Sequence, residues 1–405
     1  MIETKNNTSV EFWLLGKADN SNPSSIPLSQ IKKWQSEGAI TYLGVSDDVR
    51  EHIANASCII LPSSYREGIP LSLLEAMSME KPIITTDVPG CKETIFEKNL
   101  QEDLSIGKNG ILCLPKNVQS LQNAINFFLQ LPTESKLKMG IEGRKIAQEI
   151  FDVKNIVKFY ETKVQSLCPK SSIVFISNTS FGMYHFRLEV LKTLKNLGFA
   201  IHILAPQDES SAKLLQEGFH YHCIDIDSKS LNPYKDIKTF FQIKKILKQL
   251  KPQMSFCYTI KPVIYGSFIA RMLKIPNIAM ITGLGYVFVQ GGWKKKILKF
   301  LVCKMYQIAL SKTSEIWFLN SDDEREFLNN NITTSEKTTI LKSEGINTEH
   351  FSPRPCDSSK KIVFLLIARM LWDKGVGEFV QVAKNIKTPS CSNAPQQNSQ
   401  HTSLR

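Results

Sequence analysis

Short apolar runs alternate with helical stretches along most of this chain, and the pattern occurs twice. Runs typical of buried strands lie at 10–15, 40–43, 58–61, 83–86 and 110–114, and again at 173–176, 200–205, 219–226, 254–258, 279–282 and 316–319. Stretches of helical character lie between these runs. Strands that alternate with helices in this way form a parallel sheet with helices on both faces. The sequence therefore predicts an α/β protein with two doubly wound, Rossmann-like domains.

The point at which the pattern restarts predicts the domain boundaries. Residues 1–165 are expected to form one domain and residues 172–352 a second, with a joint of ordinary length between them. Residues 353–387 hold one more strong strand, KIVFLLIA, and one more helix. The tail 388–405 is rich in Ser, Gln, Asn, Pro and Thr and is expected to be disordered, because it has almost no apolar side chains to bury.

The composition limits which partners and which cellular compartment can be expected for this protein. With 405 residues, 42% hydrophobic and 22% charged, the chain has the balance of an ordinary globular protein. Its formal net charge of +12 favours an anionic partner, which could be nucleic acid, a phosphorylated substrate or a membrane surface. The sequence has neither a spanning apolar run nor the apolar core of a signal peptide near Met1. Nine scattered cysteines without a C-x-x-C pair favour reduced thiols, so we expect a cytoplasmic protein without a zinc site.

The stretch SSYREGIPLSLLEAM, residues 63–77, carries two glutamates with different expected surroundings. Glu67 follows the strand at 58–61, and Pro70 is suited to the first turn of a helix. Glu75 lies in that helix, four residues after Leu71, on the face that should be buried. A buried carboxylate needs partners, which sugar or ribose hydroxyls would supply, and the start of the helix would suit a phosphate. The alternative is a capping Glu67 and a half-exposed Glu75.

The Glu67-x7-Glu75 pattern resembles the nucleotide-sugar motif of retaining glycosyltransferases of the GT-B fold, family 4. The flanking stretches GAITYLGVSDDVREHIANASCIILPSS, KPIITTDVPGCKETI and GKNGILCLP fit the same family. The resemblance implies that Glu75 holds the ribose of the nucleotide and that Glu67 contacts donor-sugar hydroxyls. It also places Gly68, Ile69 and Pro70 among the substrate-binding residues.

The resemblance extends to the remainder of the chain. The second domain resembles the acceptor-binding domain of these enzymes through YHFRLEVLKTLKNLGF, YTIKPVIYGSFIARMLKIP and LKSEGINTEHFSP. After the strand KIVFLLIA, Arg369 and Lys374 match the cations that neutralise the donor diphosphate, and these two cations take the role of a metal ion. The alternative is a solvated basic loop. No metal and no cofactor are therefore expected; the nucleotide-sugar is a substrate.

Further residues are assigned to the site by the same comparison. Gly16, Gly44 and Val45 would line the base, and Gly182 would let the facing backbone approach the phosphates. His185 and Arg187 would meet the acceptor or the diphosphate, although His185 could equally be an ordinary histidine at the start of a helix.

The order of the segments departs from the family. The family has the acceptor domain first, whereas here most of the nucleotide domain comes first and its first strand and helix lie at 361–387. Two explanations stay open: a circular permutation of one enzyme, cut in a surface loop, or a fusion of two partial copies.

The stretch 292–305 predicts a basic amphipathic helix that begins near Trp293. Such helices lie on anionic membrane surfaces, although a helix packed on its own domain with solvated lysines has the same pattern. The sequence is similar to transferases that extend undecaprenyl-diphosphate-linked glycans, N-acetylgalactosaminyl and hexosyl transferases among them. The expected function is sugar transfer from a nucleotide-sugar, UDP-linked, to a lipid-linked or polysaccharide acceptor at the inner face of the cytoplasmic membrane. The alternative is an impaired or non-catalytic remnant that binds sugar nucleotides; nucleic acid is not an expected partner, because no recognised module is present.

Overall fold

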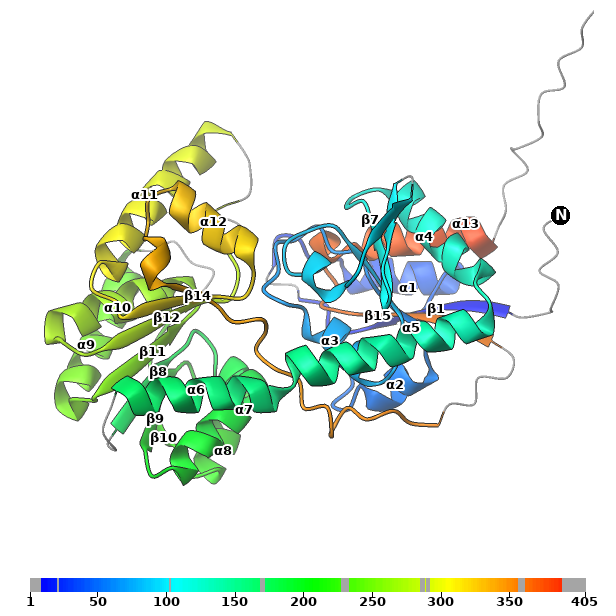
Figure 1. Ribbon diagram of the computed structural model, residues 1–405. Helices are drawn as coiled ribbons and strands as arrows, with labels where there is room; N and C mark the ends of the chain where they lie inside the picture. The colour runs from blue at the N-terminus through cyan, green and yellow to red at the C-terminus, as the bar shows by residue number, and fades with distance from the viewer. Residues whose placement is uncertain are drawn as a thin grey trace, which may run out of the picture.

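The computed structural model describes residues 9–19, 22–101, 103–167, 172–226, 233–284, 288, 292–355 and 361–387. These residues form two α/β domains, each with one sheet between layers of helices (Figure 1). This confirms the expected fold class. The predicted disordered tail, 388–405, lies outside the described residues.

The first sheet has the strand order β2-β1-β15-β3-β4-β7-β6-β5. Its parallel strands are β1 (Ser9–Leu15), β2 (Thr41–Tyr42), β3 (Cys58–Leu61), β4 (Ile83–Thr86), β7 (Gly110–Cys113) and β15 (Lys361–Ile367). At one edge, β5 (Asn99–Gln101) and β6 (Leu104–Ile106) add an antiparallel hairpin that the strand pattern did not predict. The short, exposed β5 limits the pairing edge that the sheet offers to other chains.

Strand β15 lies inside this sheet although it comes last in the chain. It pairs with β1 along its whole length, from Ser9 opposite Lys361 to Leu15 opposite Ile367, and on its other side with β3. Phe364, Leu365 and Leu366 are fully buried. The two ends of the chain therefore build one sheet.

Helices cover both faces of the first sheet. They are α1 (Leu28–Ser36), α2 (Arg50–Asn55), α3 (Leu71–Ser78), α4 (Val118–Gln130), α5 (Thr133–Ile146) and α13 (Val376–Lys387). Helix α5 ends at Ile146, and the chain continues from it as a π-helical turn, Ala147–Phe151.

The second sheet is parallel throughout, in the order β10-β9-β8-β11-β12-β13-β14. Its strands are β8 (Ser172–Ile176), β9 (Ala200–Ala205), β10 (His220–Cys223), β11 (Met254–Tyr258), β12 (Asn277–Ile281), β13 (Glu315–Phe318) and β14 (Thr338–Ile340). Its helices are α7 (Ser180–Asn196), α8 (Glu209–Gln216), α9 (Pro233–Leu250), α10 (Ile260–Leu273), α11 (Trp293–Leu310) and α12 (Ser321–Asn329). Within the described part of the chain, no helix has the length and apolar content that crossing a membrane requires.

Helix α6 (Val153–Leu167) joins the two domains. Its Tyr160 is buried, and its hydroxyl lies 3.0 Å from that of Tyr258 on β11. Lys163 pairs with Glu315 at 2.5 Å. Helix α6 therefore follows the first domain in the chain and packs against the second, so it connects the two domains.

Candidate donor site

The loop that leaves β3 carries Glu67, and its carboxylate has two partners. Lys374 forms an ion pair with it, and the Ser63 hydroxyl donates a hydrogen bond to it at 3.0 Å. The side chains of Glu67 and Lys374 are each only 14% exposed. The ammonium of Lys374 also lies 5.5 Å from the centre of the Tyr65 ring. Two residues that the sequence assigned to one site, 307 positions apart, are thus in contact.

Strand order explains why these residues meet. Because β15 lies next to β3, the loops that follow the two strands leave the same edge of the sheet. The backbone N–H of Ser64 donates to the carbonyl of Asp373 at 2.8 Å, and the Ser63 hydroxyl lies 3.3 Å from the same oxygen. Gly375 has a φ of +75°, and a Cβ there would lie 2.0 Å from the carbonyl oxygen of Pro62. Only glycine allows this approach of the two loops.

Arg369, the other predicted cation, is more open. Its side chain is 55% exposed and lies 3.6 Å from the Asp19 carboxylate. Burial raises the pKa of the Tyr65 phenol, and the charge of Arg369 partly opposes that rise, so Arg369 and Lys374 both act on the surroundings of Tyr65. An exposed guanidinium near a buried ammonium is an arrangement that can bind a diphosphate.

Glu75 lies in α3, as predicted, and is half-buried. Among the described residues, no hydrogen bond or ion pair reaches its carboxyl group. Burial raises its pKa to about 7. Its neighbours Leu74 and Met77 are fully buried, which explains the apolar surroundings. A half-buried carboxyl without partners can accept hydrogen bonds from ligand hydroxyls.

Glu67 does not cap α3. The alternative interpretation in which Glu67 is a capping residue is therefore wrong. The residue before α3 is Pro70, with a φ of −67° and no side-chain cap. Ile69 is buried. Gly68 lies against the second domain: a Cβ there would come within 2.7 Å of the carbonyl oxygen of Thr282 and 2.6 Å of Leu319. The close approach at Gly68 is therefore to protein backbone in this structure.

The residues expected to line the base lie at the ends of β1 and β2. The N–H of Gly16 donates to the carbonyl of Gly44 at 2.7 Å, and the Tyr42 hydroxyl donates to the carbonyl of Gly16 at 2.9 Å. Val45 is 65% exposed. The structure brings these three positions together and leaves an open surface beside them.

The predicted residues of the second domain all lie in α7, with different surroundings. The Arg187 guanidinium is buried, stacks 4.0 Å above the Tyr258 ring and pairs with Glu344. Its charge is thus engaged inside the protein rather than at a ligand surface. The His185 ring lies 4.1 Å from the Phe181 ring, measured between centroids, and burial lowers the pKa of His185 below the ordinary 6.5. Gly182 is buried in the first turn of α7, where a Cβ would lie 3.0 Å from Thr179.

Several residues that the sequence did not indicate contribute to this site. Ser63 donates to Glu67, Tyr65 lies beside the Lys374 ammonium, and the carbonyl of Asp373 accepts from the hydroxyls of Ser63 and Ser64. Arg66 joins the motif to the second domain. Ser63, Tyr65 and Arg66 lie within the motif itself, but nothing local in the sequence distinguishes a loop residue that pairs across domains. No three His, Cys, Asp or Glu side chains of the described residues are grouped so that they could hold a metal ion.

Two family models match the chain. The family described as "Glycosyl transferases group 1" matches residues 1–130, and the family described as "Glycosyl transferase 4-like" matches residues 172–320. The matches fall on the first and the second domain respectively.

Relatives with curated names match about half of the chain. N,N'-diacetylbacillosaminyl-diphospho-undecaprenol alpha-1,3-N-acetylgalactosaminyltransferase of Campylobacter jejuni is 32% identical over 228 residues, which cover 53% of this chain and 60% of that protein. UDP-Gal:alpha-D-GlcNAc-diphosphoundecaprenol alpha-1,3-galactosyltransferase of Escherichia coli is 23% identical over 216 residues, 51% of this chain and 54% of that protein. Among solved structures, a glycosyltransferase from Rickettsia africae is 18% identical, with a TM-score of 0.34 over 43% of each chain. The chain thus spans less than two thirds of the length of these relatives. Both domains are thus similar in sequence to glycosyltransferases, the first through its match to the group 1 family and the second through its match to the glycosyltransferase 4-like family.

Proposed function

We propose that this protein is a retaining glycosyltransferase of the GT-B type that transfers a sugar from a UDP-linked donor to a lipid-linked acceptor. The observation that carries the proposal is the largely buried Glu67–Lys374 pair, which is made by loops far apart in the sequence. Helix α3, which follows the Glu67 loop, presents Glu75, whose carboxyl group has no hydrogen-bond or ion-pair partner among the described residues. The names of the relatives add the acceptor class, undecaprenyl-diphosphate-linked glycans, and one of them adds a UDP-linked donor.

Each residue has a defined task in this proposal. Lys374 and Arg369 stabilise the departing diphosphate, where negative charge grows as the bond to the sugar breaks. Glu67 accepts hydrogen bonds from the donor sugar, and Lys374 orients it by holding one carboxylate oxygen. Glu75 accepts hydrogen bonds from the ribose, which compensates a carboxylate that burial destabilises.

We also propose that one chain forms one complete donor site, whether the segment order arose by circular permutation or by fusion of two partial copies. The continuous pairing of β15 with β1, and its pairing with β3, support this, since both ends of the chain contribute to one sheet. The rival reading, an impaired remnant that binds sugar nucleotides without turnover, makes the opposite prediction for product formation.

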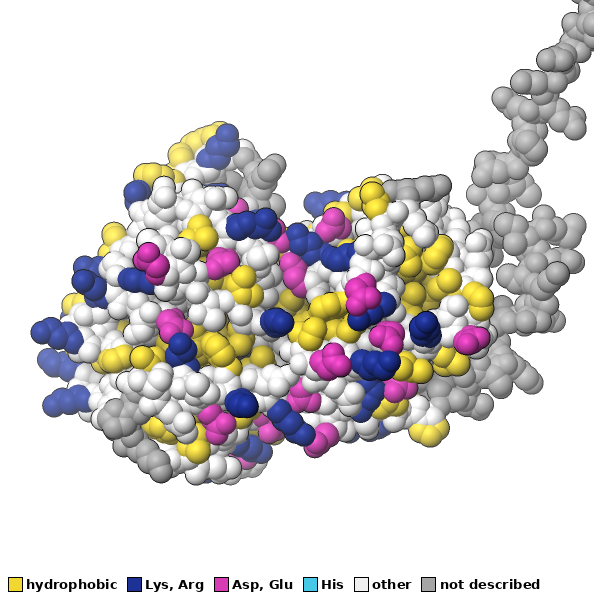
Figure 2. All heavy atoms as spheres, in the orientation of Figure 1, with side chains coloured by type: hydrophobic (Ala, Val, Ile, Leu, Met, Phe, Trp, Pro, Cys, Tyr) yellow, Lys and Arg dark blue, Asp and Glu magenta, His cyan; other side chains and the backbone are white. Residues whose placement is uncertain are grey.

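The membrane part of the proposal rests first on α11. Its exposed apolar side chains recur at helical spacing along one side of the helix: Trp293, Ile297, Phe300, Leu301, Met305 and Ile308. Cys303 and Tyr306 face the protein interior. Lys296 and Lys304 are exposed beside this apolar stripe. Yellow and dark blue side chains lie side by side over α11 (Figure 2). An apolar stripe flanked by lysines is the surface that binds the headgroup region of an anionic bilayer.

Lys299 is not part of this surface. It pairs with Glu326 at 2.5 Å, and its ammonium lies 5.4 Å from the centre of the Phe288 ring. Leu298 and Val302 are partly buried.

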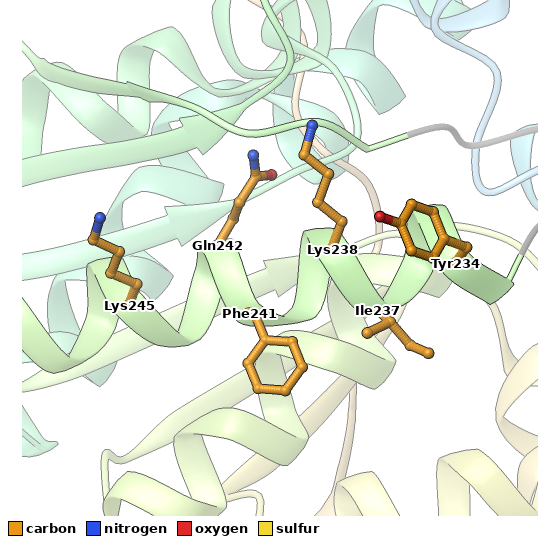
Figure 3. A pocket seen from close by; sticks show the side chains of 6 residues that line it. All are labelled: Tyr234, Ile237, Lys238, Phe241, Gln242 and Lys245. Atoms are coloured by element: carbon orange, nitrogen blue, oxygen red, sulfur yellow. The ribbon is translucent and has the colours of Figure 1, made fainter.

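Helix α9 adds a second surface of the same chemistry. Tyr234, Ile237 and Phe241 are exposed along it. Figure 3 shows Ile237 and Phe241 on one side of the helix and Lys238 and Lys245 on the other. Both α9 and α11 pack against α10, so they lie on the same side of the second sheet. We propose that this side rests on the inner face of the cytoplasmic membrane.

The test is incubation of the purified protein with UDP- and GDP-sugars and a bacterial membrane lipid extract, with mass analysis of the products. We expect one sugar to be added to a lipid-linked acceptor from a UDP-sugar. Lys374→Gln should abolish the product, and Lys154→Gln, which removes an exposed lysine paired with Glu349, should not. Nucleotide binding without any product would favour the remnant; absence of both would refute the proposal.

A further inference from the structure

The second domain contacts the Glu67 loop directly. Asn320, the residue that precedes α12, donates a hydrogen bond from its Nδ2 to the carbonyl oxygen of Glu67 at 3.2 Å. On the other side, the backbone N–H of Glu67 donates to the carbonyl of Pro89 at 3.1 Å. The peptide groups of this one residue are thus held by both domains.

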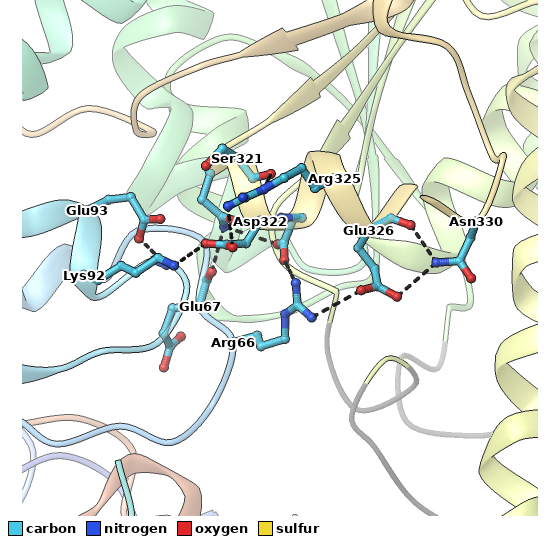
Figure 4. Close-up of polar contacts among 12 residues, drawn as sticks. Arg66, Glu67, Lys92, Glu93, Ser321, Asp322, Arg325, Glu326 and Asn330 are labelled. Atoms are coloured by element: carbon cyan, nitrogen blue, oxygen red, sulfur yellow. Dashed lines mark hydrogen bonds and ion pairs between the residues drawn. The ribbon is translucent and has the colours of Figure 1, made fainter. Parts of the chain in front are cut away.

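The neighbouring Arg66 strengthens this contact. Its guanidinium pairs with Asp323 on α12 at 3.0 Å and reaches Glu326 at 3.8 Å. The Asp323 side chain is almost completely buried. Lys92 of the first domain pairs with Asp322 at 2.7 Å. Figure 4 shows these groups converging from two sides on the start of α12.

The packing around Gly68 leaves no space for a side chain. A Cβ at Gly68 would meet Thr282 and Leu319, the residues that follow β12 and β13. Backbone hydrogen bonds, a buried ion pair and this close packing therefore act on three consecutive residues, Arg66, Glu67 and Gly68. The Glu67 side chain, by contrast, contacts Ser63 and Lys374, which lie in loops of the first domain.

We propose that Asn320 and Asp323 are positioning residues for the donor site: from the second domain, they fix the backbone of Glu67 so that its carboxylate meets the donor sugar. This inference rests on the proposed function, in which Glu67 contacts that sugar. It assigns to α12 a task that none of the sequence motifs indicated. It also makes the geometry of the donor motif dependent on contact between the domains.

The consequence is a specific division between binding and turnover. Nucleotide binding uses Glu75, Arg369 and Lys374, all in the first domain, and does not require α12. Turnover requires Glu67 to be oriented, and small misplacement of a positioning group lowers rates by about tenfold to a hundredfold. Loss of the α12 contact should therefore lower kcat and leave UDP affinity unchanged.

The sharpest variant is Asn320→Ser. Asn320 also caps α12, because its Oδ1 accepts from the N–H of Asp323 at 2.8 Å. Serine caps helices about as well as asparagine, but its hydroxyl is one bond shorter and cannot reach the Glu67 carbonyl. The matched control is Arg325→Gln, on the same helix, which removes an exposed side chain paired with Asp322.

The experiment compares kcat, KM for the nucleotide-sugar and UDP affinity for wild type, Asn320→Ser, Asp323→Asn and Arg325→Gln, together with amide hydrogen exchange of residues 63–70. We expect kcat to fall about tenfold or more in Asn320→Ser and Asp323→Asn, with UDP affinity within twofold and faster exchange at Glu67 and Gly68. Arg325→Gln should behave as wild type. Unchanged kcat and unchanged exchange in Asn320→Ser would overturn the inference.

The hydrogen-exchange arm separates this inference from the proposed function. If the wild-type protein forms no product while exchange at Glu67 still accelerates in both variants, the proposed function fails and the positioning contact stands. If product forms in wild type and in Asn320→Ser at the same rate, the proposed function stands and the positioning role fails.

Discussion

At the scale of single residues, Glu75 and Glu67 show two ways of holding a carboxylate out of water. Glu67 has a lysine and a serine as partners, so its charge is compensated within the protein. Glu75 has no such partner among the described residues, and burial raises its pKa from the ordinary 4.5 to about 7. A site that binds hydroxyls needs an unsatisfied acceptor, and keeping one costs stability before the ligand arrives.

We predict that Glu75→Gln stabilises the free protein and weakens UDP binding. The folded-state pKa is raised, so wild-type stability falls as pH rises from about 4.5 to 7 and stays low above that. At pH 8 the variant should be more stable by up to about 3 kcal/mol, and near pH 4 the two should be equal, measured by urea unfolding. UDP binding should weaken by about 1.5–3 kcal/mol in calorimetry at pH 8.

The control for this prediction is Glu134→Gln, which removes an exposed carboxylate on α5 and should change neither quantity. Equal UDP affinity in Glu75→Gln would reject the ribose role. Equal stability at pH 8 would show that the Glu75 carboxylate is not destabilised by burial.

At the scale of elements, the first domain needs β15 to complete its sheet. It is an interior strand with partners on both sides, and the loop after it supplies Lys374 and Arg369. Removing an interior strand leaves two unpaired edges and exposes the apolar faces it covered. The strand therefore cannot be separated by truncation from the loop that we propose binds the diphosphate.

We predict that deletion of residues 361–405 abolishes UDP binding and makes the first domain sensitive to protease. The second sheet, which has no strand from this segment, should persist as a protected fragment. Deletion of residues 390–405 alone is the control and should leave binding unchanged. A chain lacking 361–405 that stayed monomeric and bound UDP normally would contradict the single-site interpretation.

At the scale of the whole molecule, two helices of the second domain that both pack against α10 are rich in lysine. Five lysines and one aspartate lie in α9, and five lysines without an acidic residue lie in α11, in a chain whose formal net charge is +12. Exposed apolar side chains occur on the same two helices. Charge and apolar area together distinguish a lipid-binding face from an ordinary solvated basic surface.

We predict that replacing Lys294, Lys295 and Lys296 with glutamine moves the protein from anionic vesicles into solution. Each lysine near such a surface contributes about 1 kcal/mol, so vesicle affinity should fall by about a hundredfold. Added salt should release the wild type through screening. Sugar transfer to a soluble short acceptor should survive, and transfer to a lipid-linked acceptor should fall.

Co-sedimentation with vesicles of anionic or of zwitterionic lipid measures this effect. Replacing Lys32, Lys33 and Lys138 of the first domain with glutamine removes the same charge elsewhere and is the matched control. If binding is indifferent to the α11 substitutions and to salt, α11 is only a packing element of its domain.

The sequence by itself determined the elements and their type. Periodicity and length are local properties, so the strands and helices that hold Glu67 and Glu75 could be placed from a few residues on either side. The edge hairpin β5–β6 was not predicted, because its strands are only three residues long. The π-helical turn after α5 was not predicted, because its sequence pattern is that of an ordinary α-helix.

Tertiary structure alone decided which distant residues meet. The pairing of Arg187 with Glu344 inside the second domain and the hydrogen bond from Asn320 to Glu67 both join positions more than 150 residues apart. Such contacts follow from strand order and from the burial of complementary charges once the sheets have formed. A local sequence pattern shows that a side chain is charged. It shows neither the strand order nor which opposite charge the fold brings beside that side chain.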